Sequence, residues 1–368
     1  MVRHRSPLFP IHESQKAVFG TFGDWHFAMR FGEVAHEYRA ARTSVAVADW
    51  GFHTLVRLTG PDRHSFLNRL VTNRVEPAPG DGVHAFLLSS TGKPVIEMWI
   101  YDRGEDTLLE VPQSLRTRVR DDLERYHFRE ALQIHDASAD FAGLALVGPQ
   151  ARATLAHLQQ APIPDLPLYS CLDVDLEGVP ALCCRTGRLG VEAYVLWVPR
   201  SRAAAAWETL LGASPAPEAI GMDALEILRV EAGVPAYGLD YTEDTLYLEM
   251  APMDSYVEDK GCYIGQEVVA RVLHQGHVNR RLVGLEIEGE ADDPAEPGSE
   301  LLQGDAPAGR ITTTVVSPAL GPIALGYVRR DHFAAGTELG LPDGRKVRVV
   351  DLPFTLPEEA LQVEEEPS

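Results

Sequence analysis

The sequence predicts an α+β fold in which two regions of strands and helices precede a region built from strands alone. A strand, a Gly-Pro pair and a helical pattern follow one another at Gly60 and again at Gly148. Pairs of β-rich runs alternate with helical patterns up to about residue 280, which is typical of α+β proteins. From residue 281 onward only short strand patterns and turns occur, which is typical of a small barrel or sandwich.

The repeated unit begins with two strand patterns, Thr54–Leu58 and Leu144–Val147. Each is followed by Gly-Pro and then by helical spacing, with proline expected at the first helical position. Coincidence is the alternative, because Gly-Pro often joins a strand to a helix. We favour a true repeat of one strand–helix unit.

The remaining strands and helices are predicted from the spacing of apolar residues and from turn residues. Two hairpins are expected, one joining 95–101 to 107–111 around a Gly-containing turn and one joining 181–184 to 193–198. Helical spacing occupies 113–128, 203–211 and 221–231. Later strands are expected within 282–289, 309–317, 323–330, 337–342 and 346–354. We therefore expect an α+β region over 1–280 with two interleaved domains, a β-barrel over 281–356, and an acidic disordered tail over 357–368.

Charge and cysteine content exclude several classes of protein. The 368 residues include 33 Lys and Arg against 54 Asp and Glu, a net charge of −21, and no basic block that could displace counterions from nucleic acid. We expect no strong direct nucleic-acid binding, with contact to tRNA through a local basic pocket as the alternative. The four cysteines form no C-x-x-C pair, so no metal site is expected. Without an apolar leader or a membrane span, a reducing, cytoplasmic location is expected.

The densest unusual stretch is Asp259–Glu267, which reads DKGCYIGQE. The ammonium of Lys260, or a helix starting near Gln266, would lower the pKa of the Cys262 thiol and make it nucleophilic. The alternative is a buried structural cysteine. Cys183 and Cys184 lie in a strand-like run and are expected to be packing residues.

Two carboxylates are candidate functional groups. Glu231 ends a helical pattern before Gly233, where it could accept paired hydrogen bonds from a ligand, or simply pair with Arg229. Glu97 interrupts an apolar strand pattern, so it is either a buried acid or base or an outward residue of an edge strand. Arg185 lies in a turn that could meet a carboxylate tail or merely face solvent. His274 and His277 are three residues apart, but Gly276 between them indicates a loop rather than a metal site.

Taken together, these motifs resemble a known family. The run Lys260-Gly261-Cys262-Tyr263-Ile264-Gly265-Gln266-Glu267 resembles the signature of the YgfZ family of folate-binding proteins. That family belongs to a superfamily that includes GcvT, the aminomethyltransferase or T-protein of glycine cleavage. The wider resemblance runs from about Phe22 to Phe354 and includes, in order, Asp24-Trp25-His26, Val71-Thr72-Asn73, Arg185-Thr186-Gly187, Arg229-Val230-Glu231-Ala232-Gly233 and Ser317-Pro318.

The resemblance implies a cloverleaf of two ferredoxin-like α+β modules and a C-terminal β-barrel around a central channel that binds tetrahydrofolate. It places the pterin-reading carboxylate on Glu231, with Arg185 toward the glutamate tail and with Arg229 and Tyr263 in the expected cofactor-binding set. It also aligns Glu97 with the catalytic Asp of T-proteins. Glu97 keeps that charge but reaches one methylene further, and the Cys262 run departs from the T-protein pattern.

Three functions follow from the resemblance. The first is a YgfZ-like, tetrahydrofolate-binding protein that supports iron–sulfur cluster assembly or repair in client enzymes and, through them, tRNA modification. In that role Cys262 would contact a cluster transiently, because clusters usually need four ligands. The second is a folate-dependent aminomethyltransferase in which Glu97 is the acid or base. The third is a non-catalytic binding module that retains the fold but not folate.

Overall fold

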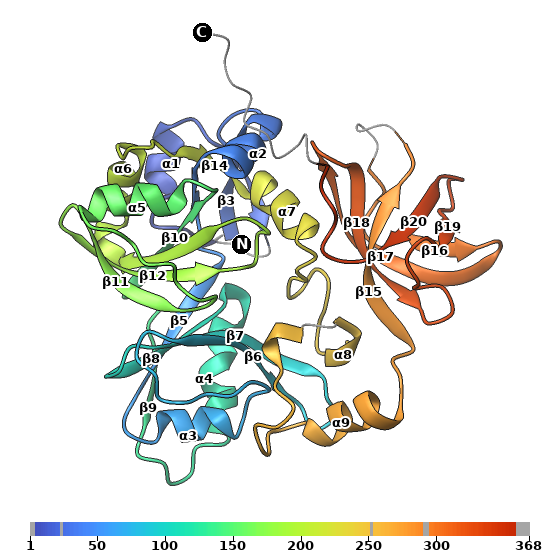
Figure 1. Ribbon diagram of the computed structural model, residues 1–368, viewed down its shortest axis with the longest axis horizontal. Coiled ribbons are helices and arrows are strands. Elements are labelled where there is room, and N and C mark those ends of the chain that lie inside the picture. Colours follow the sequence, from blue (N-terminus) through green and yellow to red (C-terminus); the bar gives the residue numbers. More distant parts are fainter. Residues whose placement is uncertain (1–3, 23–24, 251–252, 290–293, 358–368) are drawn as a thin grey trace.

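The computed structural model describes residues 4–22, 25–250, 253–289 and 294–357, and it has three lobes (Figure 1). Two lobes are α+β modules, and the third is a closed β-barrel beside them. The predicted α+β fold class with a C-terminal barrel is confirmed. The expected acidic tail lies outside the described residues, apart from Pro357. Within the described ranges, no helix combines the length and the apolar character needed to cross a membrane.

The first module is a five-stranded sheet in the order β6-β7-β8-β5-β9 with helices on its outer face. Its strands are β5 (His53–Thr59), β6 (Gly82–Leu88), β7 (Pro94–Asp102), β8 (Asp106–Pro112) and β9 (Gln133–Asp136). Its helices are α3 (Arg63–Asn68) and α4 (Arg116–Glu124), the latter preceded by a 3-10 turn at Gln113–Leu115. The helix expected over 113–128 therefore ends four residues early. The order β5-α3-β7-β8-α4-β9 is the ferredoxin-like βαββαβ pattern, with β6 added at one edge.

The second module is a six-stranded sheet in the order β11-β12-β13-β10-β4-β14. Its strands are β4 (Ala46–Asp49), β10 (Phe141–Val147), β11 (Cys171–Leu176), β12 (Val179–Thr186), β13 (Ala193–Pro199) and β14 (Glu218–Ile220). Its outer helices are α5 (Ala151–Gln159) and α6 (Ala203–Leu211), with a 3-10 turn at Arg200–Arg202. Strand β4 precedes the whole first module in the chain yet pairs with β10, so the two modules are interleaved.

The repeated strand–helix unit occupies the same position in both modules. Gly60 joins β5 to α3, Gly148 joins β10 to α5, and both glycines have positive φ, +101° and +124°. The expected position of the prolines is wrong by two residues, because α3 begins at Arg63 and α5 at Ala151. Each proline therefore lies in the turn before its helix.

The N-terminal segment and the helices after the second module connect the lobes. The segment contains β1 (His4–Arg5), α1 (Phe9–Ser14), β2 (Val18–Phe22), β3 (Trp25–Arg30) and α2 (Val34–Thr43). After the second module come α7 (Met222–Glu231), α8 (Tyr247–Met250), a 3-10 turn at Met253–Ser255, and α9 (Gln266–Gln275). Figure 1 shows α7 between the second module and the barrel, and α8 and α9 between the first module and the barrel.

The barrel closes in the order β15-β18-β17-β16-β19-β20. Its strands are β15 (Arg280–Ile287), β16 (Glu300–Gln303), β17 (Ala306–Ser317), β18 (Gly321–Arg329), β19 (Glu338–Gly340) and β20 (Lys346–Val350). Strand β16 was missed from sequence, because its four residues directly follow an acidic, proline-containing stretch that has no strand periodicity.

The inner faces of the two module sheets share one apolar core. Trp99, Tyr101 and Leu108 of the first sheet pack in the same cluster as Cys184 and Trp197 of the second. The outer face of each sheet packs on its own helices in a separate cluster. The space between the modules is therefore bordered by inward-facing strand residues of both sheets.

Candidate functional site

A cavity of about 480 Å³ lies between the two modules, α7 and the segment that follows α7. Its walls are largely aromatic, and the aromatic lining residues include Trp25, Phe27, Trp50, Phe52 and Trp99. The lining also includes Glu97, Arg188, Glu226 and Arg229, together with Val234–Leu239 after α7. Flat aromatic walls with a few convergent charged groups are typical of sites for small organic ligands.

Glu97 is buried at the wall of this cavity. Strand β7 lies between β6 and β8, so the edge-strand alternative is wrong, and Glu97 is only 4% exposed. Its carboxylate accepts a hydrogen bond from the Tyr241 hydroxyl at 2.6 Å and lies 2.9 Å from Nε2 of His84. Two neighbours therefore hold its orientation toward the cavity.

His84 connects Glu97 to the surface. Its ring stacks on Trp99 with centroids 4.8 Å apart, and Nδ1 lies 3.3 Å from the carboxylate of Asp254, which is half exposed. Burial alone would lower the pKa of His84, but the hydrogen bonds to Asp254 and Glu97 outweigh it and raise the pKa to about 9. His84 is therefore a cation at neutral pH, held between two carboxylates.

A second charged group lies beside Trp99. The Arg188 guanidinium is 3.9 Å from the Trp99 ring centroid and pairs with Glu110 at 2.6 Å. Glu110 is fully buried and also lies 3.0 Å from Nδ1 of His53. Burial raises the pKa of Glu110, but Arg188 and His53 outweigh this and hold the pKa well below its ordinary value. The cavity wall thus carries a fixed ion pair under its aromatic surface.

Two arginines were also expected to contact the ligand, and only one of them lines this cavity. Arg229 lines it and pairs with Glu226 and with Asp240, the latter at 2.7 Å. Arg185 does not line it, because its guanidinium turns outward to Asp165 at 3.1 Å and to the carbonyl of Leu166.

Glu231 lies outside the cavity lining and is 2% exposed. Its carboxylate accepts hydrogen bonds from the Tyr38 hydroxyl at 3.0 and 3.1 Å, and from Arg42 and Ser317. Gly233 ends α7 as expected, with φ of +70°. In this structure Glu231 joins α2, α7 and the barrel, and its oxygens are already occupied.

The sequence motif around Cys262 lies away from the cavity. Cys262 is a free, exposed thiol, so the alternative of a buried structural cysteine is wrong for it. The Lys260 ammonium instead binds the carbonyl oxygens of Asn68 and Val71 inside the protein. Burial, and then Arg74, lowers the pKa of Lys260 to about 8.

The rest of the motif shapes a turn that packs on the first module. Tyr263 is buried in a cluster with Phe86 and Tyr247 rather than on the cavity wall. Gly265 starts α9 with φ of +83°, and a Cβ there would approach the carbonyl of Ser89 to 2.6 Å. Gln266 accepts the Tyr263 N–H at 3.2 Å, whereas Gly261 and Glu267 are exposed.

Within the part of the chain that the structure describes, no three His, Cys, Asp or Glu side chains are grouped so that they could hold a metal ion. His274 lies in α9 and is paired with Glu258 at 2.9 Å, while His277 lies beyond the helix. Cys183 and Cys184 are fully buried, as packing residues should be.

Sequence reasoning missed His84, Glu110 and Tyr241 as members of this site, and it singled out Arg188 only as part of a basic turn, 185–190, that could meet a carboxylate tail. Glu110 interrupts the apolar run of β8 just as Glu97 interrupts β7, so the same pattern could have identified it. Arg188 carries no such signal, because its role depends on contacts with Glu110 and Trp99 across the two modules.

Comparison with known proteins identifies the family to which this architecture belongs. The GCVT N-terminal domain matches residues 8–258, and the glycine cleavage T-protein C-terminal barrel domain matches residues 280–355. An aminomethyltransferase from Thermosynechococcus vestitus is 32% identical over 340 residues, which is 92% of this chain and 90% of that protein. One from Bacillus subtilis is 30% identical over 362 residues, covering 95% and 98%.

The similarity extends to a solved structure. The crystal structure of glycine cleavage system aminomethyltransferase T from Bartonella henselae superposes with a TM-score of 0.85 at 25% identity, covering 96% of this chain and 98% of that one. The resemblance to the GcvT superfamily is therefore confirmed. These relatives are named aminomethyltransferases rather than YgfZ proteins.

Proposed function

This chain belongs to the family of the GCVT N-terminal domain and the T-protein C-terminal barrel, and on that premise we propose that it is a folate-dependent aminomethyltransferase. Tetrahydrofolate would occupy the central cavity, where the walls of Trp25, Trp50 and Trp99 suit a flat pterin ring. The observation that carries the proposal is the buried carboxylate of Glu97 on the wall of that cavity.

Glu97 would act on the reacting nitrogens of the bound folate. Its carboxylate would hold a proton or stabilise positive charge as the one-carbon unit is transferred. Tyr241 and His84 fix the direction of this carboxylate by hydrogen bonds. Because positions of reacting groups matter to about 1 Å, this double support offsets the freedom of the longer glutamate side chain.

The experiment for Glu97 is formation of methylenetetrahydrofolate from an aminomethyl donor. Glu97→Gln keeps the size of the side chain but removes its charge, and the rate should fall by about 10²–10⁴-fold, the range for losing one acid–base group. The matched control is Glu105→Gln, an exposed glutamate in the turn after the same strand, which should keep the full rate. No turnover by wild type, or equal rates in both variants, would contradict this role.

Recognition of the pterin can be assigned by comparing two glutamates on one helix. Glu226 lines the cavity, where both of its oxygens accept hydrogen bonds from Arg229, whereas Glu231 is outside the lining. In an anaerobic calorimetric titration, Glu226→Gln should weaken tetrahydrofolate binding by about 1–3 kcal/mol, the cost of a lost charged partner. Glu231→Gln should mainly lower stability. The opposite result, with binding lost in a stable Glu231→Gln protein, would restore Glu231 as the pterin-reading residue.

A second candidate function rests on the exposed thiol of Cys262. A YgfZ-like protein would present this thiol to an iron–sulfur client or its cluster, while folate occupies the distant cavity. Cys262→Ser should then abolish cluster-dependent client activity, tRNA modification included, without changing stability or tetrahydrofolate binding. Cys183→Ser, at a fully buried cysteine, is the control for general effects of losing a thiol. Full client activity with Cys262→Ser would exclude this function.

A further inference from the structure

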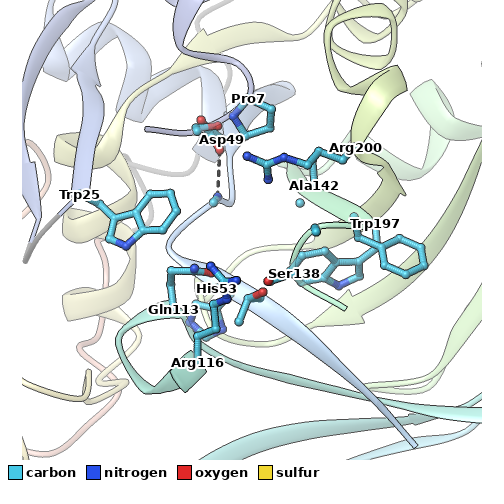
Figure 2. Close-up of a pocket in the computed structure, with 16 residues that line it drawn as sticks. Pro7, Trp25, Asp49, His53, Gln113, Arg116, Ser138, Ala142, Trp197 and Arg200 are labelled. Carbon is cyan, nitrogen blue, oxygen red and sulfur yellow. Dashed lines mark hydrogen bonds between the residues drawn. The ribbon is translucent and has the colours of Figure 1, made fainter. Parts of the chain in front are cut away.

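A second cavity, here called the side pocket (Figure 2), shares part of its lining with the central cavity. It has a volume of about 190 Å³ and is lined from β4, β5, β10, β13 and the turn before α6. Its lining shares Trp25, His53, Gln113 and Arg116 with the central cavity. Since an engineered cavity of about 150 Å³ can hold benzene, the side pocket has room for a small organic molecule.

The guanidinium of Arg200 extends into the side pocket. Figure 2 shows this side chain directed toward Asp49. Among the described residues, no hydrogen bond or ion pair involves its guanidinium, although its backbone N–H binds the carbonyl of Asp140. Arg116, by contrast, is paired with Asp136 at 3.1 Å. Because a guanidinium carries five N–H donors, Arg200 can bind a carboxylate through two parallel hydrogen bonds.

The pocket also contains a buried carboxylate, Asp49, whose charged form is stabilised by the Ser6 hydroxyl and the Gly51 N–H. Asp49 is 8% exposed, and its Oδ1 accepts the Gly51 N–H at 2.9 Å. Its Oδ2 has no hydrogen-bond partner in the described structure. His12 lies 3.8 Å away, but burial lowers the pKa of His12 to about 4, so that ring is neutral at pH 7. Burial raises the pKa of Asp49 to about 6, so the group is still mostly a carboxylate at pH 7.

Asp49 and Arg200 line the same pocket but do not pair with each other. Burial raises the pKa of Asp49, and Arg200 is among the groups that lower it. A simple anion would bring a second negative charge toward Asp49, and a simple amine would bring a second positive charge toward Arg200. A ligand that carries both charges on neighbouring atoms satisfies both groups.

We propose that the side pocket binds a small α-amino acid as a zwitterion, with its carboxylate on Arg200 and its ammonium on Asp49. The indole rings of Trp25 and Trp197 form part of the walls and favour the ammonium group. The two charges that would bind the amino acid, Asp49 and Arg200, lie outside the lining of the proposed folate site, although the two pockets share Trp25, His53, Gln113 and Arg116. The proposal does not depend on aminomethyl transfer.

The test is a calorimetric titration of the full chain with glycine and L-alanine, compared with acetate and methylamine, which each carry one of the two charges. We expect saturable binding of the amino acids, with affinity at least tenfold higher than for either half-ligand. No saturable binding of any amino acid, or equal affinity for acetate, overturns the proposal.

Variants locate the binding. Arg200→Gln should weaken amino-acid binding at least tenfold, and Arg202→Gln should leave it unchanged, because Arg202 is exposed and lies outside the pocket. Asp49→Asn should also weaken it, but Asp49 is buried, so the decisive variant is Arg200→Gln in a protein with wild-type circular dichroism. Unchanged amino-acid affinity in that variant overturns the proposal. Its tetrahydrofolate affinity should stay at the wild-type value, since Arg200 does not line the central cavity.

Discussion

The two α+β modules share a strand–Gly-Pro–helix unit, yet their inner faces differ in chemistry. The inner face of the first sheet carries His53, His84, Glu97 and Glu110, all of them buried or nearly so. The inner face of the second carries apolar residues, among them Leu182, Cys184, Val195 and Trp197. The strand–Gly-Pro–helix unit thus supports charged groups on the first sheet and apolar residues on the second sheet, and a charged group of the second module that lines the cavity, Arg188, comes from the turn between β12 and β13.

The largest effect should come from breaking the buried charges of the first sheet. Glu110→Leu leaves Arg188 buried without its carboxylate, and we expect a loss of about 3–5 kcal/mol in the free energy of unfolding. The double variant Glu110→Leu/Arg188→Met should recover most of that loss, because the pair is then replaced by apolar groups. Urea denaturation of both variants is the measurement. A double variant no more stable than the single one would show that the pair is not the source of the loss.

A smaller loss of stability, equal in both modules, should come from substituting the glycine of the strand–Gly-Pro–helix unit that the two modules share. In Gly60→Ala the new Cβ would lie 2.3 Å from the carbonyl of Ala131, and in Gly148→Ala 2.4 Å from that of Ser44. With positive φ at both sites, each variant should lose about 2–3 kcal/mol, the upper range for a strained non-glycine residue. Gly178→Ala is the control, because φ is +88° there but nothing lies within 4 Å, so a loss of about 1 kcal/mol is expected.

If the two glycine variants differ widely in urea denaturation, the modules do not share one structural unit. Equal losses, both exceeding that of the control, would support a repeat that diverged only on its inner face.

A third effect should appear as a dependence of stability on pH that comes from His84 of the first module. The pKa of His84 is raised to about 9 in the folded state from 6.5 when unfolded, so its contribution is complete below pH 6.5 and is lost as pH rises through 9. We expect about 3 kcal/mol less stability at pH 9.5 than at pH 6.5 from this residue. Lys260 acts in the opposite direction above pH 8, because its folded pKa is lowered.

The measurement is therefore the difference between wild type and His84→Gln in urea denaturation at several pH values. That difference should shrink as pH rises from 6.5 to 9.5. The contribution of Lys260 is the same in both proteins, so it cancels in the difference. A difference that is constant with pH would show that His84 is not a cation between Glu97 and Asp254.

Short-range sequence patterns were sufficient to predict many of the helices, turns and hairpins. Helix α6 spans Ala203–Leu211 as predicted, Gly233 ends α7, and β7 and β8 form the expected hairpin. These features depend on periodicity of apolar residues and on turn glycines within about ten residues of chain. Glu97 was also visible locally, since a carboxylate within an apolar strand must be either paired or exposed.

What the sequence by itself determined, then, was the order of strands and helices, the change to a barrel near residue 280 and the presence of an acid in β7. The tertiary structure alone decided that β4 pairs within the second sheet. It also decided that Arg42 and Ser317 donate hydrogen bonds to Glu231, and that Arg188 forms an ion pair with Glu110. Arg42 and Glu231 are 189 residues apart, and no local period records such a contact. Charge partners are chosen by the packing of distant segments, because a buried charge is stable only where the assembled fold supplies its counterpart.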